Sequence, residues 1–79
     1  MSARMLSYTA TMTERDVHRA MTAAMLALVT ERDAARPDPP VAEILARQIL
    51  AMATAFSDLS AQLGICPPQC VETILCLSA

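Results

Sequence analysis

The second half of the chain carries an unbroken apolar seam, in which apolar residues recur in alternating steps of three and four. Its members are Ala42, Leu45, Ile49, Met52, Phe56, Leu59 and Leu63. This spacing places side chains on one stripe of a helix that faces a partner helix. The pattern therefore predicts a long amphipathic helix over residues 39–63.

Proline and glycine mark both ends of this helix. Asp38 stands in a stiff Pro-Asp-Pro-Pro connector and is expected to cap the helix, with Pro39 at the first helical position. Gly64, the only glycine of the chain, occupies the position of a left-handed C-cap. Pro67 follows three residues later, which supports an end at Leu63.

An earlier helix is predicted over residues 13–35. Thr13 and Asp16 have the spacing of a capping box, and Met12 and Val17 have that of a hydrophobic staple. Pro37 disfavours helical geometry in the residue before it, so the helix is expected to end there. The residues expected to pack against the seam are Val17, Met21 and Leu28, with Ala24 between them.

The ends of the chain are less regular. Residues 68–77 predict a short third helix, whose apolar side chains either fold back over the hairpin or hold a second chain. Residues 1–12 contain a weak alternation typical of a strand. A single strand has no partner here, so an N-terminal arm is favoured.

The expected architecture is therefore all-α. It consists of an arm, residues 1–12, and one helical domain, residues 13–79, built as an antiparallel hairpin with a short C-terminal helix. A chain of 79 residues buries only roughly 60% of its unfolded surface, which makes a lone core marginal. Because 54% of the residues are hydrophobic, a homodimeric helical bundle is expected.

Charge and aromatic content argue against direct nucleic-acid binding. The formal net charge is −2, and the six basic residues are all arginine. No basic stripe is available to contact phosphates. Tyr8 and Phe56 are the only aromatic residues, too few for a stacking platform.

The hydropathy pattern predicts neither a membrane span nor a secretion signal. No apolar run reaches about 18 residues, the minimum for a spanning helix. Residues 20–29 are apolar, but charged residues follow at once where a signal peptide carries small ones. Three cysteines, an odd number, suit a reducing compartment. A cytoplasmic protein is expected.

His18 and the three cysteines are the candidates for chemistry. The spacings Cys66-x3-Cys70 and Cys70-x5-Cys76 do not match those of structural zinc sites, so no metal and no cofactor are expected. Cys70 and Cys76 are interpreted as small apolar residues of a helix, with redox or disulfide behaviour as the alternative. His18 lies one helical turn from Glu14, which favours a simple ion pair over pH sensing.

Catalysis would need a nucleophile, a base, an orienting group and a pocket. One glycine and short connections give little material for such a site. The sequence therefore predicts that the protein is not an enzyme.

Polar residues on the other side of the 39–63 helix form a candidate partner-binding surface. Glu43 and Arg47 are spaced one turn apart in the favourable order, and Asp58 lies further along. Leu50 falls off the seam, as either a satellite core residue or an exposed contact. The carboxylates among these four residues are expected to favour a basic partner surface.

The segment Ala55–Pro67 resembles the end of the second long helix in the TraM family of quorum-sensing antiactivators, with a similar A-x3-L-x3-L-G-x2-P arrangement. Val17-His18-Arg19 also lies where that family places a His-Arg pair on its first helix. This resemblance implies a two-helix hairpin that sequesters a LuxR-type regulator. From Pro68 onward the chain departs from the family ending.

In its overall character the chain resembles the small, acidic, single-domain anti-CRISPR proteins carried by phages and mobile elements. This resemblance implies a non-enzymatic inhibitor that occupies a surface needed by a nucleic-acid-handling effector complex. It is the leading functional hypothesis, and the antiactivator is the alternative within the same class. A structural or adaptor subunit of a larger assembly is the alternative from another class.

Overall fold

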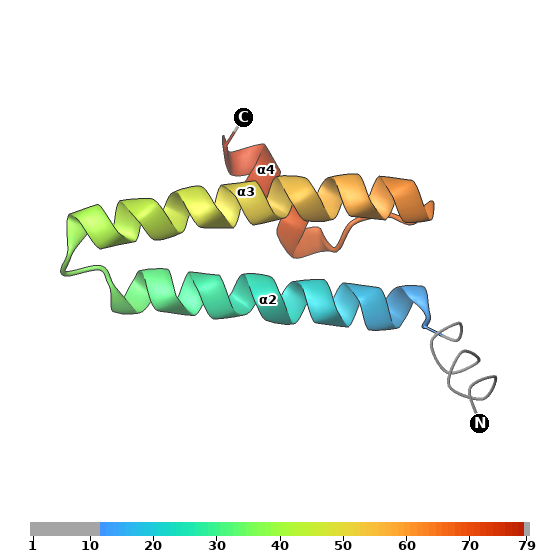
Figure 1. Ribbon diagram of the computed structural model, residues 1–79, viewed down its shortest axis with the longest axis horizontal. Coiled ribbons are helices and arrows are strands. Elements are labelled where there is room, and N and C mark those ends of the chain that lie inside the picture. The colour runs from blue at the N-terminus through green and yellow to red at the C-terminus, as the bar shows by residue number, and fades with distance from the viewer. Residues whose placement is uncertain (1–11, 79) are drawn as a thin grey trace, which may run out of the picture.

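The computed structural model describes residues 12–78, which form three α-helices (Figure 1). These are α2 (Glu14–Ala34), α3 (Pro39–Leu63) and α4 (Gln69–Ser78). Each begins and ends within one residue of its predicted bounds, and no strand occurs within residues 12–78. The predicted all-α class is therefore confirmed. The arm expected before Met12 lies outside the described residues.

The start of α2 is closed by the predicted capping box. The Asp16 backbone N–H donates to Thr13 Oγ1 at 3.2 Å, and the Thr13 backbone N–H donates to Asp16 Oδ2 at 3.1 Å. The backbone hydrogen bond from Thr13, followed by the bond with its side chain, holds the pKa of the Asp16 carboxyl below its usual value. Two of the amide groups left without partners at a helix start are satisfied in this way.

The start of α3 differs from the expectation. Asp38 is extended (φ −119°), but its side chain makes no capping hydrogen bond, so the predicted side-chain cap is wrong. A capping side chain normally accepts from the second or third amide of the helix. Here Pro39 and Pro40 occupy the first two positions, and proline has no N–H to donate. The Asp38 carbonyl instead accepts from the Ala42 N–H at 3.0 Å.

The end of α3 follows the prediction. Gly64 adopts the left-handed conformation, with φ 72° and ψ 27°. The Ile65 N–H donates to the Ser60 carbonyl at 3.0 Å, and the Gly64 N–H donates to that of Ala61 at 3.1 Å. These bonds reverse the chain and direct it toward α4.

The core lies where the three helices meet. α2 and α3 run antiparallel, and α4 passes behind α3 in the view of Figure 1 while contacting both long helices. The buried cluster consists of Met25, Ile49, Ala53 and Val71. Around it pack the partly buried residues Leu28, Val29, Met52, Phe56, Cys70, Ile74 and Leu75.

The apolar seam leaves this core at its end. Ala42, Leu45, Ile49, Met52 and Phe56 of the seam are buried or partly buried, and so are Val17, Met21 and Leu28, the α2 residues expected to pack against it. Leu59 and Leu63 are exposed by 42% and 53%, while Ser60 is fully buried. A strict alternation of threes and fours drifts by about 20° per heptad around a straight helix, which moves the buried stripe away from Leu59. Whether Leu59 and Leu63 join a dimer seam stays a prediction.

Candidate protein-interaction surfaces

Large apolar side chains remain exposed on two sides of the helical hairpin. Within residues 12–78 they are Met12, Leu26, Val41, Ile44, Leu50, Leu59, Leu63 and Leu77. Large contiguous apolar exposure marks interaction sites more often than scattered single residues do.

The first side contains a cleft between the three helices, here called the three-helix cleft. It has a volume of about 230 Å³. Its lining residues are Val29, Arg32, Ala46, Ile49, Leu50, Ile74, Leu77 and Ser78. Leu50 of α3 is 39% exposed and Leu77 of α4 is 81% exposed, so large apolar side chains from two helices stand open to solvent here.

The predicted partner-binding residues share one side of α3, and Leu50 among them lines this cleft. Helical geometry places Glu43, Arg47, Leu50 and Asp58 within about a quarter turn of one another around α3. Arg47 Nη2 donates to Glu43 Oε1 at 3.0 Å, so these two charges largely neutralise each other. Asp58 carries the remaining negative charge, which makes this surface less acidic than the sequence implied.

The second side is a face of the hairpin that α4 does not cover. Val41 and Leu59 each stand nine residues from Leu50, or two and a half helical turns. They therefore project from the side of α3 opposite the one that meets the cleft and α4. Ile44 and Ala55, one turn away from Val41 and Leu59 respectively, extend the same side.

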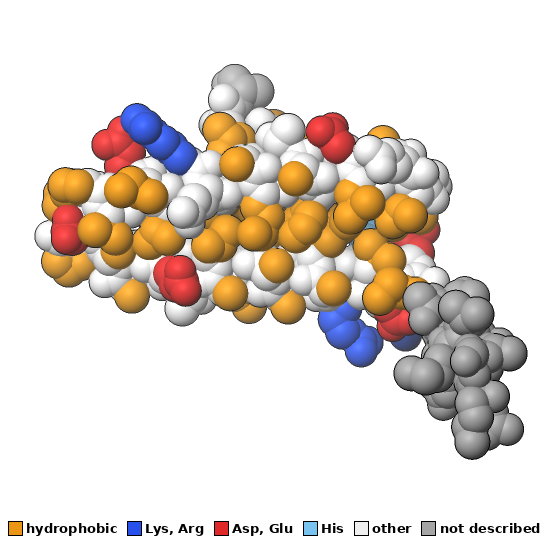
Figure 2. Space-filling view, viewed as in Figure 1, with side chains coloured by type: hydrophobic (Ala, Val, Ile, Leu, Met, Phe, Trp, Pro, Cys, Tyr) orange, Lys and Arg blue, Asp and Glu red, His pale blue; other side chains and the backbone are white. Residues whose placement is uncertain are grey.

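The corresponding side of α2 carries a row of alanines. Thr22 Oγ1 accepts from Cys70 Sγ at 3.7 Å, so Thr22 faces α4. Helical spacing turns Ala20, Ala24 and Ala27 away from Thr22 and hence away from α4. Figure 2 shows hydrophobic side chains in a continuous band along the junction of α2 and α3 on this side. We call it the uncovered hairpin face, formed by Ala20, Ala24 and Ala27 of α2 and Val41, Ile44, Ala55 and Leu59 of α3.

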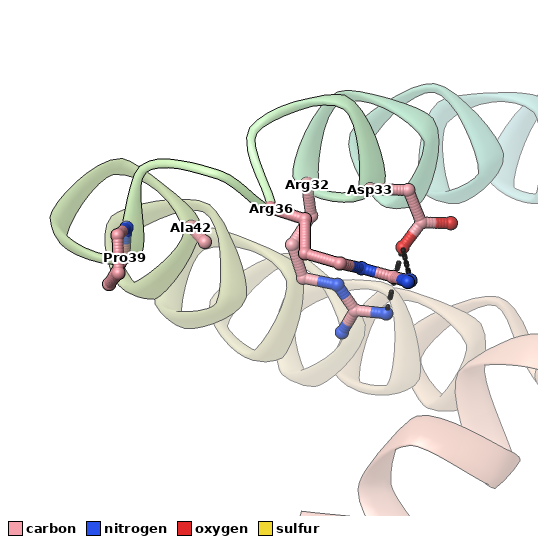
Figure 3. Close-up of a pocket in the computed structure, with 5 residues that line it drawn as sticks. All are labelled: Arg32, Asp33, Arg36, Pro39 and Ala42. Carbon is pink, nitrogen blue, oxygen red and sulfur yellow. Dashed lines mark ion pairs between the residues drawn. The ribbon is translucent and has the colours of Figure 1, made fainter.

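A third feature lies at the connection between α2 and α3 and was not predicted from the sequence. An open hollow of about 470 Å³ is lined by Arg32, Asp33, Arg36, Pro39 and Ala42 (Figure 3). Both guanidinium groups approach the Asp33 carboxylate, with Nη2–Oδ1 distances of 3.8 Å from Arg32 and 3.7 Å from Arg36. Both distances exceed hydrogen-bonding range, and exposed ion pairs of this kind contribute little stability. The one-turn spacing of Arg32 and Arg36 was the available signal.

His18, near the start of α2, contacts the loop that precedes α4. Its Nε2 is hydrogen-bonded to the Cys66 carbonyl at 2.5 Å, and it also approaches Glu14 Oε2 at 3.9 Å. The sequence indicated the Glu14 pair but not the carbonyl, because the partner is 48 residues away. This contact joins α2 to the α3–α4 connection.

The side chains of the three cysteines take no part in this histidine contact, which uses only the backbone carbonyl of Cys66. All three are free thiols. Cys70 packs against the core, whereas Cys66 and Cys76 are exposed, so the small-apolar interpretation fits Cys70 better than Cys76. No group of three or more histidine, cysteine or acidic side chains within residues 12–78 is arranged to hold a metal ion.

No helix within residues 12–78 has both the length and the hydropathy needed to cross a membrane. Comparisons with protein-family models, curated proteins and solved structures found no match for this chain.

Proposed function

We propose that the protein is a small non-enzymatic inhibitor that acts in the cytoplasm by binding another protein. The observation that carries this proposal is the three-helix cleft, where Leu50 and Leu77 border an apolar hollow of about 230 Å³. Binding energy at protein interfaces concentrates where one partner inserts a large side chain into such a hollow. The cleft suits one apolar side chain of a target.

The charged residues beside the cleft supply a polar rim. Arg32 of α2 is part of its wall, and the Glu43–Arg47 pair lies next to Ala46 of the wall on α3. Asp58 lies on the same side of α3, about 12 Å further along from Leu50. Charges at an interface rim mainly affect the association rate and the choice of partner. We expect reversal of Asp58 to slow association with a basic target surface more than it speeds dissociation.

The proposed target is a CRISPR effector complex. This follows from the resemblance to small acidic anti-CRISPR proteins, and binding would occlude a surface that the effector needs. The second candidate is a quorum-sensing antiactivator that sequesters a LuxR-type regulator. It is supported by the hairpin and by the left-handed Gly64 at the close of α3, within the Ala55–Pro67 segment that resembles the TraM family.

Substitution in the cleft tests this proposal. We expect Leu77→Asp to weaken target binding by at least about tenfold, because it places an uncompensated charge at a desolvated contact. Leu26→Asp is the matched control, because Leu26 is 62% exposed and lies outside the cleft. The measurements are capture of purified effector complex and of a LuxR-type regulator, together with protection of a phage from CRISPR interference.

The outcomes separate the candidates. Capture of the effector that is lost in Leu77→Asp but kept in Leu26→Asp supports the anti-CRISPR proposal. Capture of the regulator alone supports the antiactivator. Binding of neither protein would contradict both inhibitors and favour a structural or adaptor subunit.

We also propose that the protein is a homodimer. The fully buried hydrophobic residues within residues 12–78 are Met21, Met25, Ile49, Ala53 and Val71. A core this small gives limited stability to a chain of 79 residues, and association is a common remedy. A dimer would carry two three-helix clefts.

A further inference from the structure

We propose that the uncovered hairpin face joins two copies of this chain across a two-fold axis. The assignment rests on the proposed homodimer and specifies which surface forms it. Two hairpins packed face to face make a four-helix bundle, a stable arrangement for amphipathic helices. α4 and the three-helix cleft then lie on the outside of the dimer, because they occupy the opposite side of each hairpin.

The face is complementary to itself in shape. α2 contributes small side chains from Ala20, Ala24 and Ala27, whereas α3 contributes large ones from Ile44 and Leu59. A two-fold interface brings the same surface of each copy together. When α2 of one copy packs on α3 of the other, the large Leu59 side chain meets the start of the alanine row, and it does so twice.

The face also has few charges to desolvate. The charged residues of α3 (Glu43, Arg47 and Asp58) lie outside the line of Val41, Ile44, Ala55 and Leu59. On α2, Asp16 stands one turn before the alanine row. Glu31 stands one turn after it and, because α2 and α3 run antiparallel, lies level with Ile44, so Glu31 is the carboxylate that this face carries. Burial of this face therefore removes few charges from water, and the Glu31 carboxylate of each copy must keep its contact with solvent or gain a partner.

The size of the face matches what a stable dimer needs. α2 has 21 residues and α3 has 25, so the shared length is about 31 Å at 1.5 Å per residue. Two adjacent helices about 10 Å wide give on the order of 600 Å² in flat projection. Accessible area exceeds flat projection, and a standard interface buries about 800 Å² of accessible surface per partner.

Two charge insertions test the assignment by sedimentation velocity at fixed micromolar concentration. Ile44 is 55% exposed, and Ala20 is exposed with only a methyl group to lose, so neither Ile44→Glu nor Ala20→Glu should unfold the chain. Both are expected to weaken dimerisation by at least about tenfold. Leu26→Glu, on a different side of α2 from Ala20, is the matched control and should remain dimeric. Far-UV circular dichroism verifies helicity in each variant.

Each outcome bears on one proposal. Dimeric wild type and Leu26→Glu, with helical but monomeric Ile44→Glu and Ala20→Glu, support the assignment. A dimeric wild type whose two variants also remain dimeric would overturn the assignment but leave the homodimer standing. A monomeric wild type would overturn the homodimer and this assignment together. The measurement uses no target, so failure to capture an effector affects only the inhibitor proposal.

Discussion

At the scale of single residues, Gly64 shows how one backbone angle limits sequence choice. Its φ of 72° lies in the left-handed region, which costs a residue with a Cβ roughly 1–2 kcal/mol. No atom lies within 4 Å of a Cβ built at this position, so the cost is conformational and not a clash. We expect Gly64→Ala to lower the free energy of unfolding by about 1 kcal/mol in chemical denaturation.

Asparagine provides the matched control for that substitution. Asn tolerates the left-handed region better than other residues with a Cβ, so Gly64→Asn should cost clearly less than Gly64→Ala. Equal losses for both variants would contradict a conformational origin of the effect.

Asp16 gives a prediction about pH. Its pKa is lowered below 3.8 in the folded state because the carboxylate accepts the hydrogen bond from the Thr13 backbone N–H. Because the pKa is lower in the folded state, the ionised carboxylate stabilises the fold at pH values above 3.8. This contribution to stability disappears as the pH falls through the folded-state pKa. We therefore expect the thermal unfolding midpoint of the wild type to fall on acidification through this range.

Asp16→Asn is the control, because it keeps an acceptor oxygen but cannot titrate. Its unfolding midpoint should lack the acid-dependent component seen in the wild type. Parallel pH profiles for the two proteins would show that the capping carboxylate does not contribute to the pH dependence.

At the scale of helices, the sequence predicted where each helix begins and ends better than it predicted which residues pack in the core. Thr13 and Gly64 act through near neighbours in the chain, so their effects were readable from local spacing. Asp38 was misjudged although its signal is also local, because Pro40 removes one of the two amides that a capping side chain can meet. Within the single chain Leu59 is exposed and Ser60 takes the buried position, which the seam pattern did not indicate.

The placement of α4 could not be read from local pattern. Its apolar residues predicted burial, but they left open whether it covers its own hairpin or a second chain. The answer depends on contacts such as that between Cys70 and Thr22, which are 48 residues apart. The three-helix cleft was unpredictable for the same reason, since it exists only where three separate helices meet. Leu50 was identified as off the seam, but its role as part of a cleft wall was not.

Val71 is the residue through which α4 holds to the core. It is fully buried and belongs to the cluster with Met25, Ile49 and Ala53. We expect Val71→Ala to lower the free energy of unfolding by about 2 kcal/mol, from lost apolar burial and the cavity that remains. Thr73→Ala, an exposed change on the same helix, should stay within about 0.5 kcal/mol. Urea denaturation followed by circular dichroism measures both, and equal effects would argue against docking of α4 through Val71.

At the scale of the whole molecule, the two interaction surfaces lie on opposite sides of the hairpin. Val41 and Leu59 project away from the side of α3 that carries Leu50, so one surface can be occupied without blocking the other. A dimer formed through the uncovered hairpin face would therefore display two clefts facing outward. If a target carries two matching sites within reach, such a dimer gains avidity without any new contact.

This arrangement predicts that stability depends on protein concentration. Dimerisation stabilises the folded state by mass action, so the thermal unfolding midpoint of the wild type should rise as the protein concentration is raised. In Ile44→Glu the face carries a charge, and the midpoint should become independent of concentration, whereas in Leu26→Glu it should still rise. Differential scanning calorimetry of each protein, at concentrations that span about a hundredfold range, measures these midpoints. A wild-type midpoint that does not move would mean that the small core is sufficient by itself, because a protein that folds as a monomer gains nothing from its own concentration.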